Sequence, residues 1–451
     1  MTSEPEPGVA FPRTPEGRRS TSALGRAVIA DALRAVDPAG ARAAEQETSW
    51  RTGYLPHFRR AIETGVGSPA AAVSIAAHGL ASLHDRMRVV GRDGAETTLD
   101  DWVGGTTVPD TTRSGTTGLA TGLATAPPIV TGLRTVEVRG STRPEAELSL
   151  PYRGERLRGD GVHRRLDAWV AAGVLEPSAA EAVRTVLRTP GWLRLEGRTV
   201  AVLGAGAEMG PLPALLRWGA HTAAVDLPVP QVWQRVLATA RPSAGTALLP
   251  VPAGTSSPDP LRAGADLVSD MPAVAEWLLG VDGPLVVGNY VYADGADNVR
   301  VAMAVDALST RLLQTRDDVA LAFLATPTDV FAVPAEAVRH STDAYAARSA
   351  TAKTLGRPLR AVSAGRLLRR AYLPGADPGI NDSLVPQQGP NYALAKRLQR
   401  WRATTARRGG VTVSMNVAPP TRTRSVVRNR ALAAAYAGAH RFGVEVFEPA
   451  T

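Results

Sequence analysis

Short, continuous apolar runs alternate with longer amphipathic stretches from residue 199 to the end of the chain. The runs are rich in Val, Leu and Ala, and each is long enough for one strand: TVAVL (199–203), TAAVD (222–226), ALLPV (247–251), PLVVGN (284–289), DVALAFLA (318–325), GVTVSMN (410–416) and VEVFEP (444–449). Apolar strands that alternate with helices are typical of a parallel sheet covered on both faces. The pattern predicts a doubly wound α/β domain over residues 196–451.

The first half of the chain has a different pattern, in which apolar residues recur at helical spacing. Four helical segments are expected: 22–36, 55–65, 68–87 and 162–188. Two short strands are also expected: 133–140 and 146–152. Residues 1–22 are rich in Pro, Glu and Arg and are expected to be flexible, and the Thr/Gly-rich segment 104–134 is expected to be a loop. The sequence therefore predicts a mainly helical N-terminal region over residues 23–195.

Composition removes several classes of chemistry. The chain has 451 residues and no cysteine, so disulfides, thiolate nucleophiles, Cys-bound zinc and iron–sulfur clusters are excluded. The histidines have no metal-ligand spacing, and no metal site is expected. No apolar run reaches the roughly 18 residues of a membrane span, and the first residues lack the apolar core of a secretory signal. The expectation is a cytoplasmic protein without a membrane partner.

The net charge of +9 is concentrated in one segment. Residues 396–430 hold Lys396 and nine arginines with no acidic residue, whereas basic and acidic residues nearly balance elsewhere. Apolar and Pro-rich stretches interrupt this block, and Trp401 is its only aromatic residue, so nucleic-acid binding is not expected. A pocket for an anionic ligand or a subunit interface, as in a homo-oligomer, explains the block better. Of 51 basic residues only Lys353 and Lys396 are lysines, and arginine cannot supply a compact, tunable ammonium group.

A glycine-rich segment follows the first strand of the α/β half. It contains Gly204, Gly206, Glu208, Met209 and Gly210, and a helical segment comes next. Glycines at such a turn let the backbone approach a pyrophosphate, which then lies at a helix N-terminus. The next strand ends at Asp226, 22 residues after the first glycine, where an acid binds an adenosine ribose and repels a 2′-phosphate. An acid at this position favours NAD over NADP.

Tyr392 and Lys396 form a YxxxK motif in YALAK. Residues four apart lie on one helix face, so the ammonium group is expected to lower the pKa of the phenol. Such a tyrosine can exchange a proton with a carbonyl oxygen while hydride moves.

Over residues 195–451 the sequence resembles the short-chain dehydrogenase/reductase family, whose fold is a Rossmann sheet. Five motifs match in the family's order: the glycine loop, Asp266 and Leu267 beside the adenine, Asn289 in the NNAG-like LVVGNYVYADG, YALAK, and Asn416, Pro419 and Thr421 in VTVSMNVAPPTRT beside the nicotinamide. The family's first loop is usually GxxxGxG, and this chain departs from it.

The resemblance implies that Tyr392 is the acid/base and that Lys396 tunes it and holds the nicotinamide ribose. A serine normally ends the fifth strand, and here Thr326 or Thr328 stands in its place, with Ser383 as an alternative. The family's fourth-helix Asn has no clear counterpart, and Asp306 is the candidate.

Residues 335–390 form an insertion between the fifth strand and the catalytic tyrosine. Within this fold it would cover the nicotinamide as a mobile lid. Its arginines at 366, 369 and 370 are candidates for binding a carboxylate or phosphate of an anionic substrate, with a solvated helix face as the other interpretation.

Taken together, the residues predict an NAD(P)-dependent oxidoreductase that moves a hydride between nicotinamide and a carbonyl or alcohol of a small molecule. The atypical glycine loop and the uncertain serine leave an alternative, a catalytically degenerate NAD(P)-binding sensor or scaffold. A polyketide-type ketoreductase fits the length, but the helical first half argues against it.

Overall fold

A computed structural model describes residues 7–91, 93–104, 132–254, 259–347, 372–442 and 444–449, with two single residues at 354 and 358. Its centre is a seven-stranded sheet in the order β14-β11-β10-β7-β8-β9-β4. The strands are β4 (Leu133–Arg139), β7 (Thr199–Leu203), β8 (His221–Val225), β9 (Thr246–Pro252), β10 (Leu285–Asn289), β11 (Val319–Ala325) and β14 (Val413–Val417). All pairs are parallel except β4 with β9. The order turns back at β7, as in a doubly wound, Rossmann-like fold.

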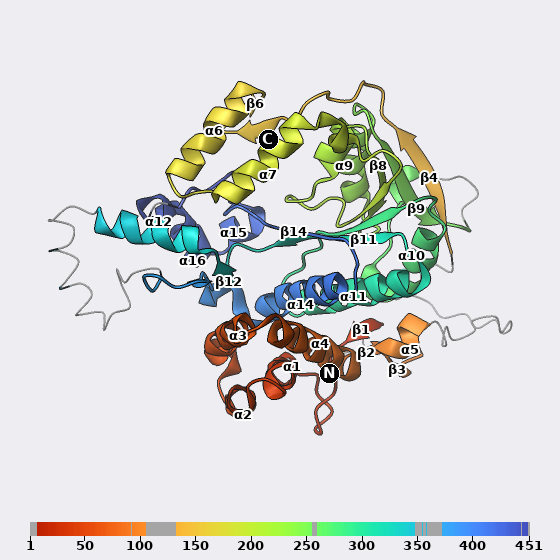
Figure 1. Cartoon of the computed structure of the whole chain (residues 1–451). Helices are drawn as coiled ribbons and strands as arrows, with labels where there is room; N and C mark the ends of the chain where they lie inside the picture. Colours follow the sequence, from red (N-terminus) through yellow and green to blue (C-terminus); the bar gives the residue numbers. More distant parts are fainter. Residues whose placement is uncertain are drawn as a thin grey trace.

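Helices cover both faces of this sheet (Figure 1). One face carries α8 (Leu212–Arg217) and α9 (Pro230–Ala240), and the other carries α10 (Leu267–Leu279), α11 (Asp297–Thr315) and α14 (Gly389–Arg408). Successive side chains of a strand point to opposite faces. Val200 and Val202 accordingly pack with α8 and α9, whereas Ala201 and Leu203 pack in the larger core with α10, α11 and α14. This explains why the strand sequences are apolar throughout.

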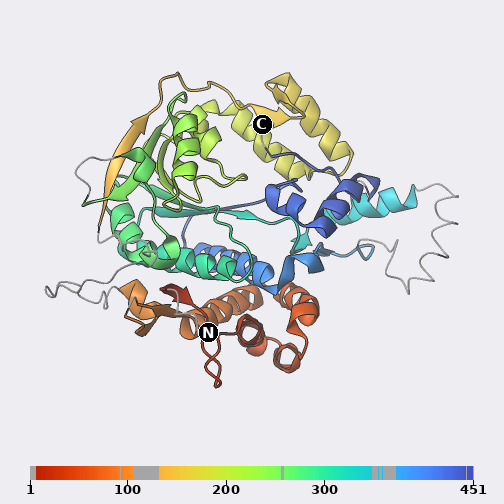
Figure 2. The same ribbon diagram turned by 180° about the vertical axis from the view of Figure 1, so that it is seen from behind.

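Four N-terminal helices form an additional layer beneath α11 and α14 (Figures 1 and 2). They are α1 (Thr21–Arg34), α2 (Pro38–Gln46), α3 (Trp50–Val66) and α4 (Pro69–Arg86). A Cβ atom on Gly79 would lie 2.4 Å from the Trp401 ring, so the glycine allows α4 and α14 to approach closely. Their apolar residues belong to the same core cluster as the sheet, so this region is packed against the α/β part along its length.

A buried ionic cluster joins the N-terminal helices to the sheet region. The Asp306 carboxylate accepts two hydrogen bonds from Arg402, each 2.7 Å, and contacts His84 Nε2 at 2.7 Å. Burial alone would raise the pKa of Asp306, but the two cations hold it well below its usual range. Burial disfavours charged His84, yet the same carboxylate outweighs this and raises its pKa. Asp306 therefore binds α4 to α14 and does not occupy the place of the family's asparagine.

Two expectations about the first half were wrong in part. Gly8–Ala10 form β1, which pairs with β2 (Arg88–Val90), and β2 pairs with β3 (Glu96–Thr98) ahead of α5 (Leu99–Gly104). Val9 and Phe11 are buried, so part of the segment 1–22 packs into the core. Its polar residues had predicted a flexible segment. Strand β4 is not part of a separate N-terminal region, because it completes the main sheet as an antiparallel edge strand. Most of the expected loop at 104–134 lies outside the described residues.

A small satellite core lies above the sheet. It contains the hairpin β5 (Leu150–Tyr152) and β6 (Glu155–Leu157), α6 (Asp160–Ala171), α7 (Pro177–Arg188) and η1 (Pro190–Arg194). The expected strand over 444–449 is not formed: Phe447 makes one isolated bridge to Thr421 and packs into this satellite core instead. Glu445 accepts hydrogen bonds from Tyr152 and Trp169, which fixes the segment there.

The remaining elements surround the carboxyl edge of the sheet. They are η2 (Pro260–Arg262), β12 (Val330–Val333), α12 (Ala335–Ala346), β13 (Gly379–Asp382), η3 (Pro386–Gln388), α15 (Arg424–Arg428), α16 (Arg430–Gly438) and η4 (Ala439–Phe442). Within the described residues, no helix combines the length and the apolar character needed to cross a membrane.

Candidate functional site

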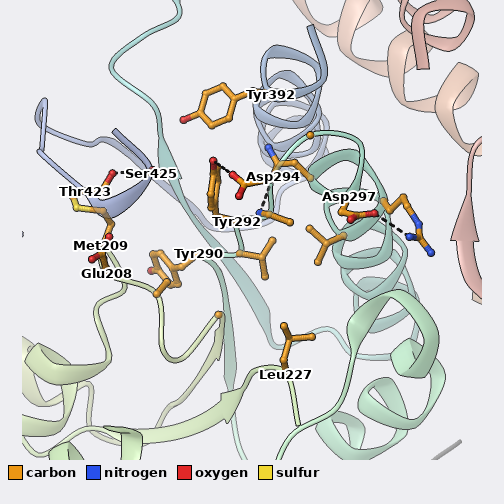
Figure 3. A pocket seen from close by; sticks show the side chains of 18 of the residues that line it. Glu208, Met209, Leu227, Tyr290, Tyr292, Asp294, Asp297, Tyr392, Thr423 and Ser425 are labelled. Carbon is orange, nitrogen blue, oxygen red and sulfur yellow. Dashed lines mark hydrogen bonds and ion pairs between the residues drawn. The ribbon is translucent and has the colours of Figure 1, made fainter. Parts of the chain in front are cut away.

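A cleft of about 2000 Å³ runs along the carboxyl ends of the parallel strands. In doubly wound sheets this edge, at the point where the strand order turns back, is where ligands bind. Nearly all of the residues singled out from the sequence line the cleft: Gly204, Gly206, Glu208, Met209, Asp226, Asp266, Leu267, Asn289, Thr326, Thr328, Tyr392, Lys396, Pro419 and Thr421. Gly210 and Asn416 are not part of its lining. Leu227 and Tyr392 lie at opposite ends (Figure 3).

The glycine loop is shaped by contacts that exclude side chains. Gly204 has a φ of +85°, and a Cβ atom there would lie 2.9 Å from the Tyr290 carbonyl oxygen. A Cβ atom on Gly206 would lie 2.9 Å from Val232. Asp226 Oδ2 accepts the Gly206 N–H at 2.7 Å, so the carboxylate at the end of β8 braces the loop. The first two glycines are therefore required by the local geometry.

The helix after this loop differs from the sequence expectation. α8 is only six residues long and begins at Leu212, with Pro211 at its cap and Pro213 inside its first turn. Proline has no backbone N–H, so these positions offer no donors to an anion. The two prolines therefore lower the number of backbone N–H groups that the N-terminus of α8 can offer to the expected pyrophosphate.

The end of the cleft beyond Asp226 carries both signs of charge. Arg235 and Arg262 line it together with that carboxylate, and neither arginine was singled out from the sequence. Asp266 caps α10, with its Oδ1 atom accepting the Val268 N–H at 2.9 Å. Asp226 is thus the acid that binds the glycine loop, whereas Asp266 caps the N-terminus of α10.

Three polar side chains are linked by hydrogen bonds at the cleft, two of which line it. Lys396 Nζ donates to Gln399 Oε1 at 3.3 Å, and Gln399 Nε2 donates to Asn289 Oδ1 at 3.5 Å. Burial lowers the pKa of Lys396 to about 8. The lysine is therefore charged at neutral pH and loses its charge only slightly above it.

Tyr392 lies at the start of α14 and faces the cleft (Figure 3). Burial raises the pKa of its phenol to about 12, although the nearby Thr326 side chain favours the ionised form. The expected lowering of this pKa by Lys396 is not found: Thr326 is the side chain that lowers it, and the Lys396 ammonium group donates to Gln399. At neutral pH Tyr392 is a proton donor.

Thr326 is the hydroxyl that accompanies Tyr392. Its Oγ1 atom lies 2.8 Å from Thr328 Oγ1, and Gln388 Nε2 donates to Thr328 at 2.6 Å. Ser383 is not among the residues that line the cleft, and its hydroxyl donates to Asn381. Of the three candidates from the sequence, Thr326 is the one whose side chain interacts with the Tyr392 phenol, and Thr328 contacts Thr326.

A second tyrosine, which the sequence analysis missed, shares the site. The rings of Tyr292 and Tyr392 are 6.2 Å apart and nearly perpendicular, and the Tyr292 hydroxyl donates to Asp294 at 2.7 Å (Figure 3). Burial and the Asp294 carboxylate raise the pKa of Tyr292. No spacing rule singles out this residue, although it lies in the quoted LVVGNYVYADG segment.

The opposite wall of the cleft comes from the segment after β14. Arg424 Nε forms an ion pair with Glu208 Oε1 at 3.0 Å. The backbone N–H of Arg424 donates to the other oxygen of the same carboxylate, Glu208 Oε2, at 2.9 Å. The Thr421 hydroxyl donates to the Pro419 carbonyl at 2.9 Å. The glycine loop is therefore linked directly to α15.

The described part of the insertion contributes little to the cleft. Residues 386–390 line it, whereas α12 packs elsewhere, with His340 against Gly173 near α6. This placement does not support a lid built on α12. The arginines at 366, 369 and 370 and Lys353 lie outside the described residues.

Much of the basic block over 396–430 is paired with acids from other segments. Arg397 and Arg400 contact Asp329, and Arg402 contacts Asp306. Arg422 and Arg424 contact Glu448 and Glu208. Five of the ten cations in this block thus form ion pairs, with four acids from other segments.

Comparisons of the chain with protein-family models, with curated proteins and with solved structures found no match. Among the described residues, no group of three or more His, Asp or Glu side chains is arranged to hold a metal ion.

Proposed function

We propose that the chain is an NAD(P)-dependent oxidoreductase that interconverts a carbonyl compound and an alcohol. The observation that carries the proposal is that Tyr392, Lys396 and Thr326 line the same cleft as Gly204 and Asp226. These residues come from β7, β8, β11 and α14, far apart in the sequence. The resemblance to the short-chain dehydrogenase/reductase family gives the same assignment to the tyrosine, the lysine and the hydroxyl.

The size of the cleft supports a dinucleotide as its ligand. Its volume of about 2000 Å³ exceeds that of common small-molecule pockets, which leaves room for a cofactor and a substrate together. The Gly204 backbone lies so close to Tyr290 that a side chain is excluded there. Asp226 directly follows β8, the strand after the glycine loop, where an acid for the adenosine ribose is expected, and its charge favours NAD over NADP.

The protein's own groups perform the acid/base part of the reaction. The hydride for the carbonyl carbon would come from a reduced nicotinamide held by the residues of the cleft. Tyr392, protonated at neutral pH, gives its phenolic proton to the carbonyl oxygen, which becomes the alcohol. The Thr326 hydroxyl orients that oxygen, and the Lys396 ammonium stabilises the phenolate left on Tyr392.

A binding-only sensor is the second candidate, and the state of the catalytic pair favours it. Burial raises the pKa of Tyr392 to about 12, and the Lys396 ammonium group donates to Gln399 Oε1 at 3.3 Å. A phenol whose pKa is raised rather than lowered is less suited to proton exchange near neutral pH.

The two candidates are separated by turnover. The full chain is incubated with NADH and a panel of aldehydes and ketones at neutral pH, with Tyr392→Phe as the control. We expect NADH oxidation by the wild type and none above background by the variant. Saturable NADH binding with no turnover on any carbonyl would favour the sensor.

A further inference from the structure

The glycine loop offers few donors to a diphosphate because most of its backbone is self-bonded. The N–H groups of Gly204 and Ala205 donate to Val225, and that of Gly206 donates to Asp226. The N–H groups of Ala207 and Gly210 donate to carbonyls of the loop itself. The two prolines of α8 have no N–H. A dinucleotide bound here therefore needs positive charge from another element.

Arg424 supplies a cation at the right place. Its guanidinium is bound to Glu208, a residue of the glycine loop, with Nε 3.0 Å from the carboxylate. Arg424 lines the same cleft, and about three quarters of its side chain is exposed to it or to solvent. The neighbouring Thr423 and Ser425 lie beside Glu208 and Met209 (Figure 3). The arginine is thus held directly beside the loop.

Glu208 behaves as an internal anion at this position. It contacts the guanidinium as a phosphate would, and an exposed ion pair of this kind contributes little to stability. A diphosphate carries more charge and can form the paired hydrogen bonds that guanidinium groups favour. Glu208 also accepts the Arg424 backbone N–H at 2.9 Å, and a diphosphate has enough oxygens to accept from both donors in its place.

From these contacts we infer that Arg424 binds the diphosphate of the dinucleotide and that Glu208 is the anion it replaces. The inference rests on the proposed function, since it concerns the ligand of the same cleft. It also reverses the role expected for Glu208 from the sequence, because its charge then opposes the cofactor.

The chain offers a matched control for the charge. Arg422 lies two residues earlier, does not line the cleft, and pairs with Glu448 at 3.1 Å. Arg422→Gln removes the same charge from the same segment, so any general effect of net charge appears in both variants. Of these two variants, only Arg424→Gln removes a guanidinium that lines the cleft and contacts the loop.

The test is calorimetric titration of the full chain and its variants with NADH, ADP and adenosine. Because hydrogen bonds to a charged group are strong, Arg424→Gln should weaken ADP and NADH by about tenfold and leave adenosine unchanged. Glu208→Gln should strengthen ADP, and Arg422→Gln should match the wild type.

The outcomes separate the two claims. If the wild type binds NADH and ADP but Arg424→Gln binds them equally well, or Glu208→Gln weakens ADP, the inference is wrong and the proposed function stands. If the wild type binds neither NADH nor ADP, both are wrong. Melting temperatures of the variants identify any loss of affinity that comes from unfolding.

Discussion

The two ends of the cleft are built by different means. At the proposed catalytic end, the chemistry would belong to side chains: Tyr392 and Lys396 share one helix face, and Thr326 lies beside the phenol. At the proposed phosphate end, the donors of this fold are normally backbone N–H groups, and here Val225, Asp226 and the loop's own carbonyls accept from most of them. The difference indicates that a phosphate at this end would need side-chain donors such as Arg424.

The largest effect is expected for Tyr392→Phe. The ring and its packing remain, but the proton donor is lost, so turnover should fall by about a thousandfold with NADH affinity unchanged. Steady-state kinetics and calorimetry on the same samples provide the measurement. Tyr292→Phe is the matched control, and it should keep most of the activity. If Tyr292→Phe were the inactive variant, the two tyrosines would have exchanged roles.

Lys396→Arg should reduce turnover by about tenfold or more even though the charge is kept, because a guanidinium cannot replace the compact ammonium group. Lys353→Arg makes the same change at the chain's only other lysine and should be silent. The pKa of Lys396 is about 8, so wild-type reduction should be constant below that pH and decline above it as the lysine loses its proton. A pH–rate profile without this decline, or full activity in Lys396→Arg, would contradict the role of the lysine.

Gly204→Ala tests the phosphate end. The new methyl group meets the Tyr290 carbonyl at 2.9 Å in a backbone conformation with a φ of +85°. We expect a loss of about 1–3 kcal/mol of unfolding free energy, measured in urea, and weaker NADH binding. Gly295→Ala has a φ of +60° with no atom within 4 Å, so it isolates the backbone cost. Equal losses of NADH affinity in both variants would show that the loop contact is unimportant.

The smallest effect concerns the choice of cofactor. Asp226→Ser removes the charge that repels a 2′-phosphate, and the preference for NADH over NADPH should narrow by about tenfold. Arg235→Gln should widen the preference for NADH over NADPH, because Arg235 lines the same end of the cleft and its positive charge attracts a 2′-phosphate. Titration of both variants with both cofactors gives the ratios. Tighter binding of NADPH than NADH by the wild type would overturn the assignment.

The sequence predicted what depends on short-range spacing. Tyr392 and Lys396 are four residues apart, and six of the seven apolar runs expected to be strands in the second half form strands of the main sheet. The long-range pairs were not predicted: Thr326 could be distinguished from Ser383 only once β11 and β13 were placed. Strand β4 shows the same limit, because its segment was recognised but its partner β9 lies more than a hundred residues away.

Ion pairs between distant segments were the other source of error. Asp306 is an acid near the expected position of the family's asparagine, and nothing in its neighbourhood in the sequence indicates that His84 and Arg402 enclose it. Arg424 was likewise one arginine among many until its ion pair with Glu208 was known. Pairing between segments, rather than residue type, decided both roles.

Calorimetric titration of the full wild-type chain with NADH and NADPH decides whether the cleft binds a nicotinamide dinucleotide. We expect saturable binding at one site per chain, tighter for NADH, with ADP as a competitor. Absence of saturable binding for both cofactors at millimolar concentration would contradict this expectation.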